Sequence, residues 1–141
     1  MATFNKFNSF VEHLAEGVHN LGADTLKVLL TNTAPVAANS VKADLTEIAA
    51  GNGYTAGGSA ASITSSAQTS GTYKLVLGDV TFTASGGAIG PFRYAVLYND
   101  TPASPADPLI GWWDYGSSIS VSAGDSWTWD ADPATGVLTL A

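Results

Sequence analysis

The sequence predicts a mainly β protein, a single-domain antiparallel β-sandwich or barrel with an N-terminal amphipathic helix. Three observations lead to this fold class. The length of 141 residues is that of one ordinary domain. The spacing of apolar residues changes from helical to alternating after Leu21, and from Leu26 onward Gly, Asp and Asn separate short strand-like runs. We find no internal repeat and no linker, so residues 1–141 are treated as one domain.

Residues 1–22 form the predicted helical segment. Ser9 followed by Glu12 fits a capping box near its start, and Gly17 or Gly22 is expected to end it. Apolar side chains recur every three or four residues, as on one face of a helix. They are Phe4, Phe7, Phe10, Val11, Leu14, Val18 and Leu21.

The rest of the chain consists mostly of predicted strands. β-Branched and aromatic residues are frequent in each run, and turn residues lie between the runs. A short second helix is expected at residues 44–50, with Asp44 as its N-cap and the Gly-Asn-Gly sequence at 51–53 as its stop. The predicted strands are 26–31, 61–69, 73–78, 80–84, 92–99, 109–115, 118–122, 126–130 and 137–140.

Two stretches indicate which surfaces need cover. Residues 51–71 are rich in Gly, Ser and Thr, so they are expected to form a loop, or an arm that lies along a neighbour. The strand at 92–99 is apolar on both sides, which predicts a central position or an interface. Alternation places Phe92, Tyr94, Val96 and Tyr98 on one face and Ala95 and Leu97 on the other, whereas Trp127 and Trp129 share one face of their strand.

The charge of the chain argues against several classes of partner. Twelve acidic and five basic residues give a net charge of −7. Arg93 is the last basic residue, so all the charged residues after it are acidic. A negative protein repels the phosphates of nucleic acids and of anionic membranes, so neither is an expected partner. There is no cysteine, no signal-peptide pattern and no apolar run of membrane-spanning length. Synthesis in the cytoplasm as a soluble product is expected.

Few residues are candidates for catalysis. His13 and His19 are six residues apart, which is not the spacing that places two imidazoles on one helical face, so we expect solvated or capping histidines. Asp130 and Asp132 lie on one face of an extended segment and could act as the carboxylate pair of a hydrolase. A turn beside a hairpin is the simpler interpretation. We therefore expect no enzyme, no cofactor and no metal site.

The aromatic residues between 90 and 116 are the main candidates for a binding surface. Trp112 and Trp113 are adjacent in a predicted strand, so their rings point to opposite faces. One ring could lie in the core and the other under the loop 101–108, another protein chain could bury one ring, or the rings could stack on a sugar near Asp114 and Asn99. The candidate protein-interface residues are Phe92, Tyr94, Tyr98, Trp112, Trp113 and Tyr115.

Several strings resemble a family of small virion structural proteins of tailed bacteriophages. They are LKVLLTNTAP, GNGYTAGG, GTYKLVL, GPFRYAVLYND, LIGWWDYG and VSAGDSWTW, and the resemblance extends from about Leu26 to Leu140. It includes no catalytic motif. Members of this kind are commonly head decoration (cement) proteins, often trimers, at the junctions between hexamers of the major capsid protein; others belong to tails or fibres.

The resemblance implies a non-enzymatic structural protein that stabilises contacts between capsomers on the exterior of the capsid. Its expected partners are the major capsid protein and copies of itself. The alternative is a tail or fibre protein that acts as a carbohydrate-binding or receptor-binding module. The low charge, the strand that needs cover on both faces and the Gly/Ser/Thr-rich stretch are compatible with a subunit whose neighbours bury its surface.

Overall fold

The computed structural model describes residues 2–141 and consists mainly of β-strands, with several antiparallel sheets and one short α-helix. The strand positions expected from the sequence are largely confirmed. In chain order the elements are β1 (Asn5–Lys6), α1 (Asn8–Ala15), β2 (Leu26–Thr31), a 3₁₀ turn (Lys42–Asp44), β3 (Ser59–Ala61), β4 (Ile63–Thr69), β5 (Thr72–Leu77), β6 (Val80–Thr83), β7 (Ile89–Asn99), β8 (Leu109–Val121), β9 (Ser126–Trp129) and β10 (Leu138–Leu140).

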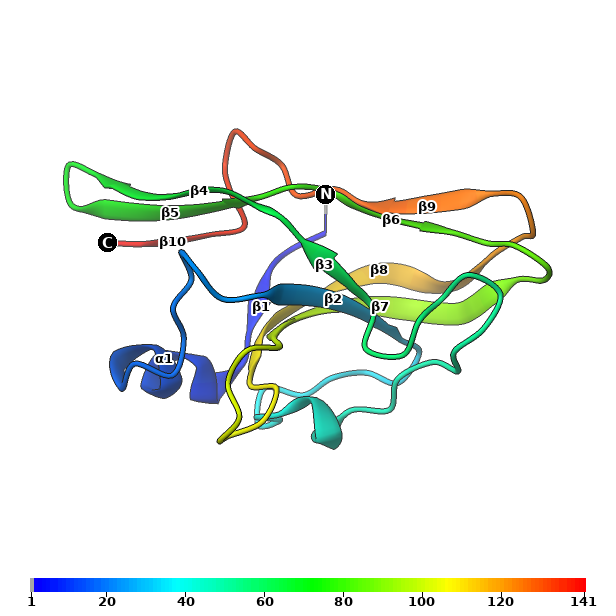
Figure 1. The fold of residues 1–141 in the computed structure, drawn as a ribbon, viewed down its shortest axis with the longest axis horizontal. Helices are drawn as coiled ribbons and strands as arrows, with labels where there is room; N and C mark the ends of the chain where they lie inside the picture. Colours follow the sequence, from blue (N-terminus) through cyan, green and yellow to red (C-terminus); the bar gives the residue numbers. More distant parts are fainter. Residues whose placement is uncertain (1) are drawn as a thin grey trace.

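The strands form three antiparallel sheets. The largest has the order β1-β8-β7-β2-β3, a second has the order β10-β5-β4, and the third pairs β6 with β9. β7 is the central strand of the large sheet, and Val96 lies between Leu29 of β2 and Trp112 of β8. Figure 1 shows the two smaller sheets along one side of the large sheet, with α1 and the long loops on its other side.

Both faces of the large sheet are covered, as the apolar character of residues 92–99 predicts. On one face, Val28 and Leu97 belong to a core that also contains Leu75 of β5 and Phe82 of β6, from the smaller sheets. On the other face, Phe7, Leu29, Val96, Tyr98 and Leu109 form a second buried cluster. Burial of this apolar surface is the main stabilising contribution to the fold.

The N-terminal segment differs from the predicted helix over residues 1–22. The helix α1 has only eight residues, Phe7 is its N-cap, and it ends before Gly17, which has a φ of 78°. The preceding residues form β1, in which Lys6 pairs with Gly111 of β8. A side chain at Gly111 would overlap the Phe4 ring. Residues 5–6 therefore pair with the open edge of β8. This tertiary pairing makes them a strand, although the spacing of apolar residues fits a helix.

The helix predicted at residues 44–50 is also absent. The Asp44 carboxylate accepts hydrogen bonds from the backbone N–H groups of Ser40 (2.9 Å) and Val41 (3.2 Å). It thereby closes the 3₁₀ turn that ends at this residue. The following residues are extended, and Glu47 forms an isolated bridge with Thr31. Asp44 therefore ends a turn and does not begin a helix.

The Gly/Ser/Thr-rich stretch 51–71 is not a free arm or a simple loop, because it contains β3 and β4. β3 pairs with β2, and β4 pairs with β5, so other strands of the same chain order this stretch. At Gly58, which has a φ of 75°, a methyl group would overlap the carbonyl of Val28. Glycine at this position allows the chain to approach β2 closely enough to pair with it.

The predicted strands 109–115 and 118–122 form one continuous strand, β8, with a bulge. Phe92 pairs with Ile119 and Tyr94 pairs with Asp114, so the four residues 115–118 lie opposite Arg93 alone. This irregularity changes the alternation of side chains. Phe92 consequently lies in the same core as Ala95 and Leu97, which corrects its predicted place on the face of Val96 and Tyr98.

Candidate functional site

The candidate site is a groove between the large sheet and β9, which we call the aromatic groove. Its volume is about 190 Å³. Rings form most of its wall, and charged and polar side chains lie among them. The lining residues are Ala2, Phe92, Arg93, Tyr94, Ala95, Trp113, Tyr115, Trp127, Thr128, Trp129 and Asp130.

Strand geometry brings these rings together. Trp127 and Trp129 are two residues apart in β9, so they point to the same side, as the sequence predicts. Trp113 of β8 lies opposite the small residue Ala95 of β7, which leaves space for the indole. The bulge in β8 displaces Tyr115 from regular pairing, and its side chain is 54% exposed. The groove therefore depends on the regular strand β9 and on the irregular strand β8.

The rings contact one another at defined angles. The Trp127 ring lies 5.1 Å from Phe92 in a T-shaped arrangement and 6.3 Å from the Tyr115 ring. Trp113 and Trp129 also form a T-shaped pair, with their ring centroids 5.1 Å apart. Edge-to-face contacts of this kind add to the stabilisation from burial and hold the rings in place. The wall of the groove is thus pre-organised.

A single ion pair lies beside the rings. The Arg93 guanidinium donates from Nε to Asp114 Oδ1 (2.8 Å) and from Nη2 to Oδ2 (3.0 Å). The hydrogen bonds from Arg93, together with one from the Gly116 N–H, lower the pKa of Asp114. The same interaction raises the pKa of Arg93. Both groups are charged near neutral pH and neutralise each other, so neither is suited to proton transfer there.

The six residues predicted for an interface fall into two sets. Phe92, Tyr94, Trp113 and Tyr115 line the aromatic groove. Tyr98 and Trp112 belong to the cluster on the opposite face of the large sheet. Trp112 and Trp113 therefore do point to opposite faces, as predicted.

The chain itself covers Tyr98 fully and Trp112 in part. The half-buried Trp112 ring packs 4.6 Å from the Phe7 ring. Tyr98 has no exposed surface, so its side chain offers nothing to a partner. Tyr98 is a core residue of this chain, as is Phe92, which is 1% exposed. The sequence shows two-sided apolar character at this strand, but it does not show which segment of the chain provides the cover.

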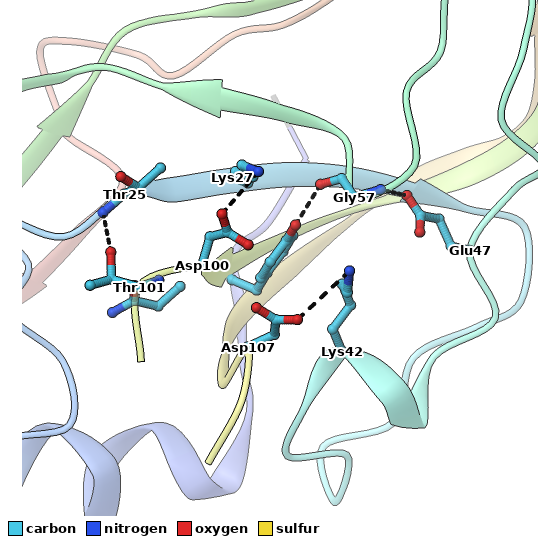
Figure 2. Close-up of polar contacts among 10 residues, drawn as sticks. Thr25, Lys27, Lys42, Glu47, Gly57, Asp100, Thr101 and Asp107 are labelled. Carbon is cyan, nitrogen blue, oxygen red and sulfur yellow. Dashed lines mark hydrogen bonds and ion pairs between the residues drawn. The ribbon is translucent and has the colours of Figure 1, made fainter. Parts of the chain in front are cut away.

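A polar network holds the segments that cover Tyr98 in position (Figure 2). Tyr98 Oη donates to the Gly57 carbonyl (2.6 Å), and Glu47 Oε1 accepts from the N–H of Gly57 (2.6 Å). Lys42 Nζ lies 5.5 Å from the centre of the Tyr98 ring and 3.7 Å from Asp107. Burial raises the pKa of the Tyr98 hydroxyl, which keeps it a neutral hydrogen-bond donor. The Glu47 carboxylate is engaged in positioning this segment.

Neighbouring contacts in Figure 2 close the ends of β2 and β7. Lys27 Nζ forms an ion pair with Asp100 at 2.9 Å, and the Thr25 N–H donates to Thr101 Oγ1 at 2.8 Å. These interactions join the start of β2 to the loop that follows β7. Since they hold two segments of the backbone together, we assign the whole network to stability.

His19 is neither solvated nor capping, whereas His13 is half-buried in the last turn of α1. Their rings lie 6.0 Å apart, and His19 is 5% exposed. Its Nδ1 accepts a hydrogen bond from Asn99 Nδ2 at 3.1 Å, which assigns the proton of the neutral ring to Nε2. Burial, together with the proximity of His13, lowers the pKa of His19 from 6.5 to about 4. His19 is therefore a neutral component of the core at pH 7.

Asp130 and Asp132 have different surroundings. Asp132 accepts hydrogen bonds from the Ala134 N–H (2.9 Å) and the Thr135 hydroxyl (3.0 Å). These bonds lower its pKa and stabilise the turn after β9, which agrees with the simpler interpretation of this segment. Asp130 instead lines the aromatic groove.

The sequence did not identify two parts of the groove. Trp127 and Trp129 were recognised as sharing a face, but that face was not associated with residues 92–115. The Arg93–Asp114 pair depends on the bulge in β8, which the sequence analysis did not predict. The adjacent Gly116, with a φ of 104°, was the one available signal of an irregular strand.

The chain was compared with known protein families, curated proteins and solved structures. No family model matches the chain, and no curated protein or solved structure is significantly similar to it. Within residues 2–141, no three His, Asp or Glu side chains gather in a group that could hold a metal ion. In the same part of the chain, every helix is too short or too polar to cross a membrane.

Proposed function

We propose that this chain is a non-enzymatic structural protein of a tailed-phage virion, namely a decoration protein that stabilises contacts between capsomers. The aromatic groove is the observation that carries the proposal. It combines two accessible rings, Tyr115 and Trp127, with an ion pair that is already neutralised. The resemblance of the sequence to small virion proteins provides the biological setting.

The groove has the chemistry of a protein anchor site. Aromatic residues and arginine are enriched where partners bury a few strongly contributing side chains, and a pre-organised wall reduces the entropy lost on binding. Of its two charged lining residues, Arg93 is engaged with Asp114 beside the groove, which disfavours acid–base catalysis by that pair, and Asp130 is exposed. We therefore propose the major capsid protein as the partner that binds this groove.

Other features support a place on the exterior of the capsid. The net charge of −7 repels packaged nucleic acid. We further propose that the two β layers form an antiparallel sandwich, because one apolar core is shared between the large sheet and the two smaller sheets. Such a subunit would bind in many copies, so modest individual contacts would suffice.

The test uses particles from which the protein has been removed and to which purified variants are added back. Tyr115→Ala and Trp127→Ala should each weaken binding at least about tenfold, as expected for anchor residues. Val36→Ala is the matched control, because Val36 is 56% exposed but does not line the groove. Binding of both groove variants at wild-type affinity would contradict the assignment of this surface.

One observation favours a second candidate, a carbohydrate-binding or receptor-binding module of a tail or fibre. Trp129 lines the groove, is 4% exposed, and its Nε1–H has no acceptor within residues 2–141. A sugar hydroxyl could accept this bond while Trp127 or Tyr115 stacks on the sugar ring. At about 190 Å³ the groove is smaller than typical drug-sized pockets, so it would hold about one ring.

The two candidates differ in what enters the groove. Neutral oligosaccharides would be titrated into labelled protein while the indole N–H signals are recorded by NMR. A saturable shift of the Trp129 signal, lost in Trp127→Ala, would favour the carbohydrate module. Unchanged signals at millimolar sugar, together with groove-dependent binding to particles, would favour the decoration protein.

A further inference from the structure

β4 is an outer strand with an open edge. It pairs with β5 and with no other strand within residues 2–141. Five of its seven residues are exposed. Figure 1 shows the β4–β5 hairpin projecting at one end of the molecule, with its turn pointing away from the large sheet. An edge strand of this length presents a row of backbone N–H and C=O groups that can pair with another strand.

The hairpin turn determines which backbone groups point outward. Ser70 and Gly71 form a two-residue loop with positive φ angles of 52° and 85°. In such a hairpin the flanking pair, Thr69 and Thr72, exchanges both backbone hydrogen bonds, and the pairs alternate from there. The N–H and C=O groups of Gln68 and Ser66 therefore point away from β5. These groups are the available pairing sites of the edge.

The usual protections of an edge strand are weak here. Proteins commonly block such edges with lysine, proline or a bulge. Residues 48–73 contain no charged residue and no proline, and the register shift in β4 is confined to Ile63–Ser65. Lys74 is the one charged side chain in the three strands of this sheet, and its Nζ lies 3.2 Å from the Ala134 carbonyl. The β4 edge is thus both accessible and neutral.

A second copy of this chain is a matching occupant, because a twofold antiparallel pair places the same neutral strand, with the same outward backbone groups, opposite itself. Two molecules of net charge −7 repel each other over most of their surfaces. Residues 48–73 form the longest uncharged stretch of the sequence, so contact along β4 avoids the repulsion that an acidic edge would create. In a twofold antiparallel pair the same strand lies opposite itself, which would oppose like charges if β4 had any.

We propose that two copies of the chain pair antiparallel through their β4 edges around a twofold axis. The result is a continuous six-stranded sheet in which β10, β5 and β4 of one protomer adjoin β4, β5 and β10 of its partner. This inference deepens the proposed function, since it names the surface by which the structural subunit contacts a copy of itself. A trimer at a capsomer junction would need a different, head-to-tail contact.

The experiment measures the mass of the purified chain by sedimentation equilibrium over a range of concentrations. A dimer is expected, and Thr69→Lys should weaken the association at least tenfold by placing a cation from each protomer at the shared edge. Thr69 lies opposite Thr72, so this substitution creates no like-charge pair within the hairpin. Val36→Lys is the matched control, because it makes the same change in net charge at an exposed residue outside β4. Each lysine lowers the net negative charge of the chain, and this effect alone would favour association. Weaker association of the β4 variant therefore reports the contact at the strand edge and not the net charge.

A second variant tests the backbone directly. Gln68→Pro removes an outward N–H that β5 does not use, so the dimer should dissociate. Because the Gln68 side chain also accepts a hydrogen bond from the Gly71 N–H at 3.0 Å, Gln68→Ala is the control for the stability of the turn. The Gln68 and Ser66 amides should also lose hydrogen-exchange protection on dilution. A wild-type monomer at all concentrations, or an oligomer that survives both β4 variants, would overturn the pairing. Neither result would bear on attachment to particles, which tests the proposed function separately.

Discussion

Trp113 and Tyr115 lie two residues apart in β8 and have different roles. The Trp113 ring is 7% exposed and packs against Phe4 and Trp129, whereas Tyr115 projects from the bulge. Trp113→Ala should therefore cost about 3–5 kcal/mol of unfolding free energy, because it leaves a cavity in the core. Tyr115→Ala should change stability by no more than about 0.5 kcal/mol.

Urea unfolding of the two purified variants compares these values. The stability of Tyr115→Ala is the informative control for the binding experiments, since loss of attachment without loss of stability identifies a surface contact. Equal and large destabilisation by both substitutions would contradict the separation of core and surface rings.

His19 predicts a dependence of stability on pH. Its pKa is about 4 in the folded chain and 6.5 for an unperturbed histidine, so the folded state binds fewer protons between these values. The contribution of neutral His19 is complete above pH 6.5 and is lost as the pH falls toward 4. Wild type should lose on the order of 3 kcal/mol more than His19→Gln between pH 7 and pH 4.

The measurement is urea unfolding of both proteins at several pH values across this window. His13 and Asp24 are the titratable groups with the strongest influence on His19, and both are unchanged in the variant. Parallel pH profiles for the two proteins would show that His19 is protonated in the folded chain as easily as in the unfolded chain.

At the scale of elements, Gly58 and Gly71 form a matched pair of positions. Both have positive φ angles, 75° and 85°, so any other residue is strained at either position. A methyl group at Gly58 would also overlap the Val28 carbonyl, whereas nothing lies within 4 Å at Gly71. Gly71→Ala should cost about 1 kcal/mol, and Gly58→Ala should cost at least about 2 kcal/mol more.

Thermal or urea unfolding of the two alanine variants would compare them directly. The difference between their free energies of unfolding measures the cost of the overlap with Val28, and hence how closely the chain before β3 approaches β2. Equal costs at the two positions would show that residues 51–71 do not pack against β2 as described.

Much of the fold could be predicted from the sequence because strands and turns depend on local patterns. β2, β5, β6 and β9 lie within a residue of the predicted runs. The N-terminal segment could not be predicted, since Phe4 and Phe7 fit a helical face but pack against the two tryptophans of β8, while the residues between them pair with that strand. The groove escaped prediction for a similar reason, because the bulge that exposes Tyr115 arises from the pairing of β7 with β8.

At the scale of the whole molecule, the low density of charge predicts how attachment responds to salt. Charged residues make up 12% of the chain and apolar residues 45%, and the groove is lined mainly by rings. Raising the salt concentration from about 0.1 M to 1 M, which shortens the Debye length from about 10 to 3 Å, should weaken attachment only slightly. Release of the protein from particles by salt alone, measured by sedimentation, would show that ion pairs dominate the interface.

The most direct test of the proposed function is to search for the chain in the phage particles that the proposal implies, by a reconstruction combined with a count of its copies. The proposal predicts hundreds of copies on the outer surface of the capsid, each with Tyr115 and Trp127 against the major capsid protein. A few copies at the tail tip or in a fibre would contradict the decoration role and favour the receptor-binding module. Absence of the chain from the particles would contradict a structural role in the virion altogether.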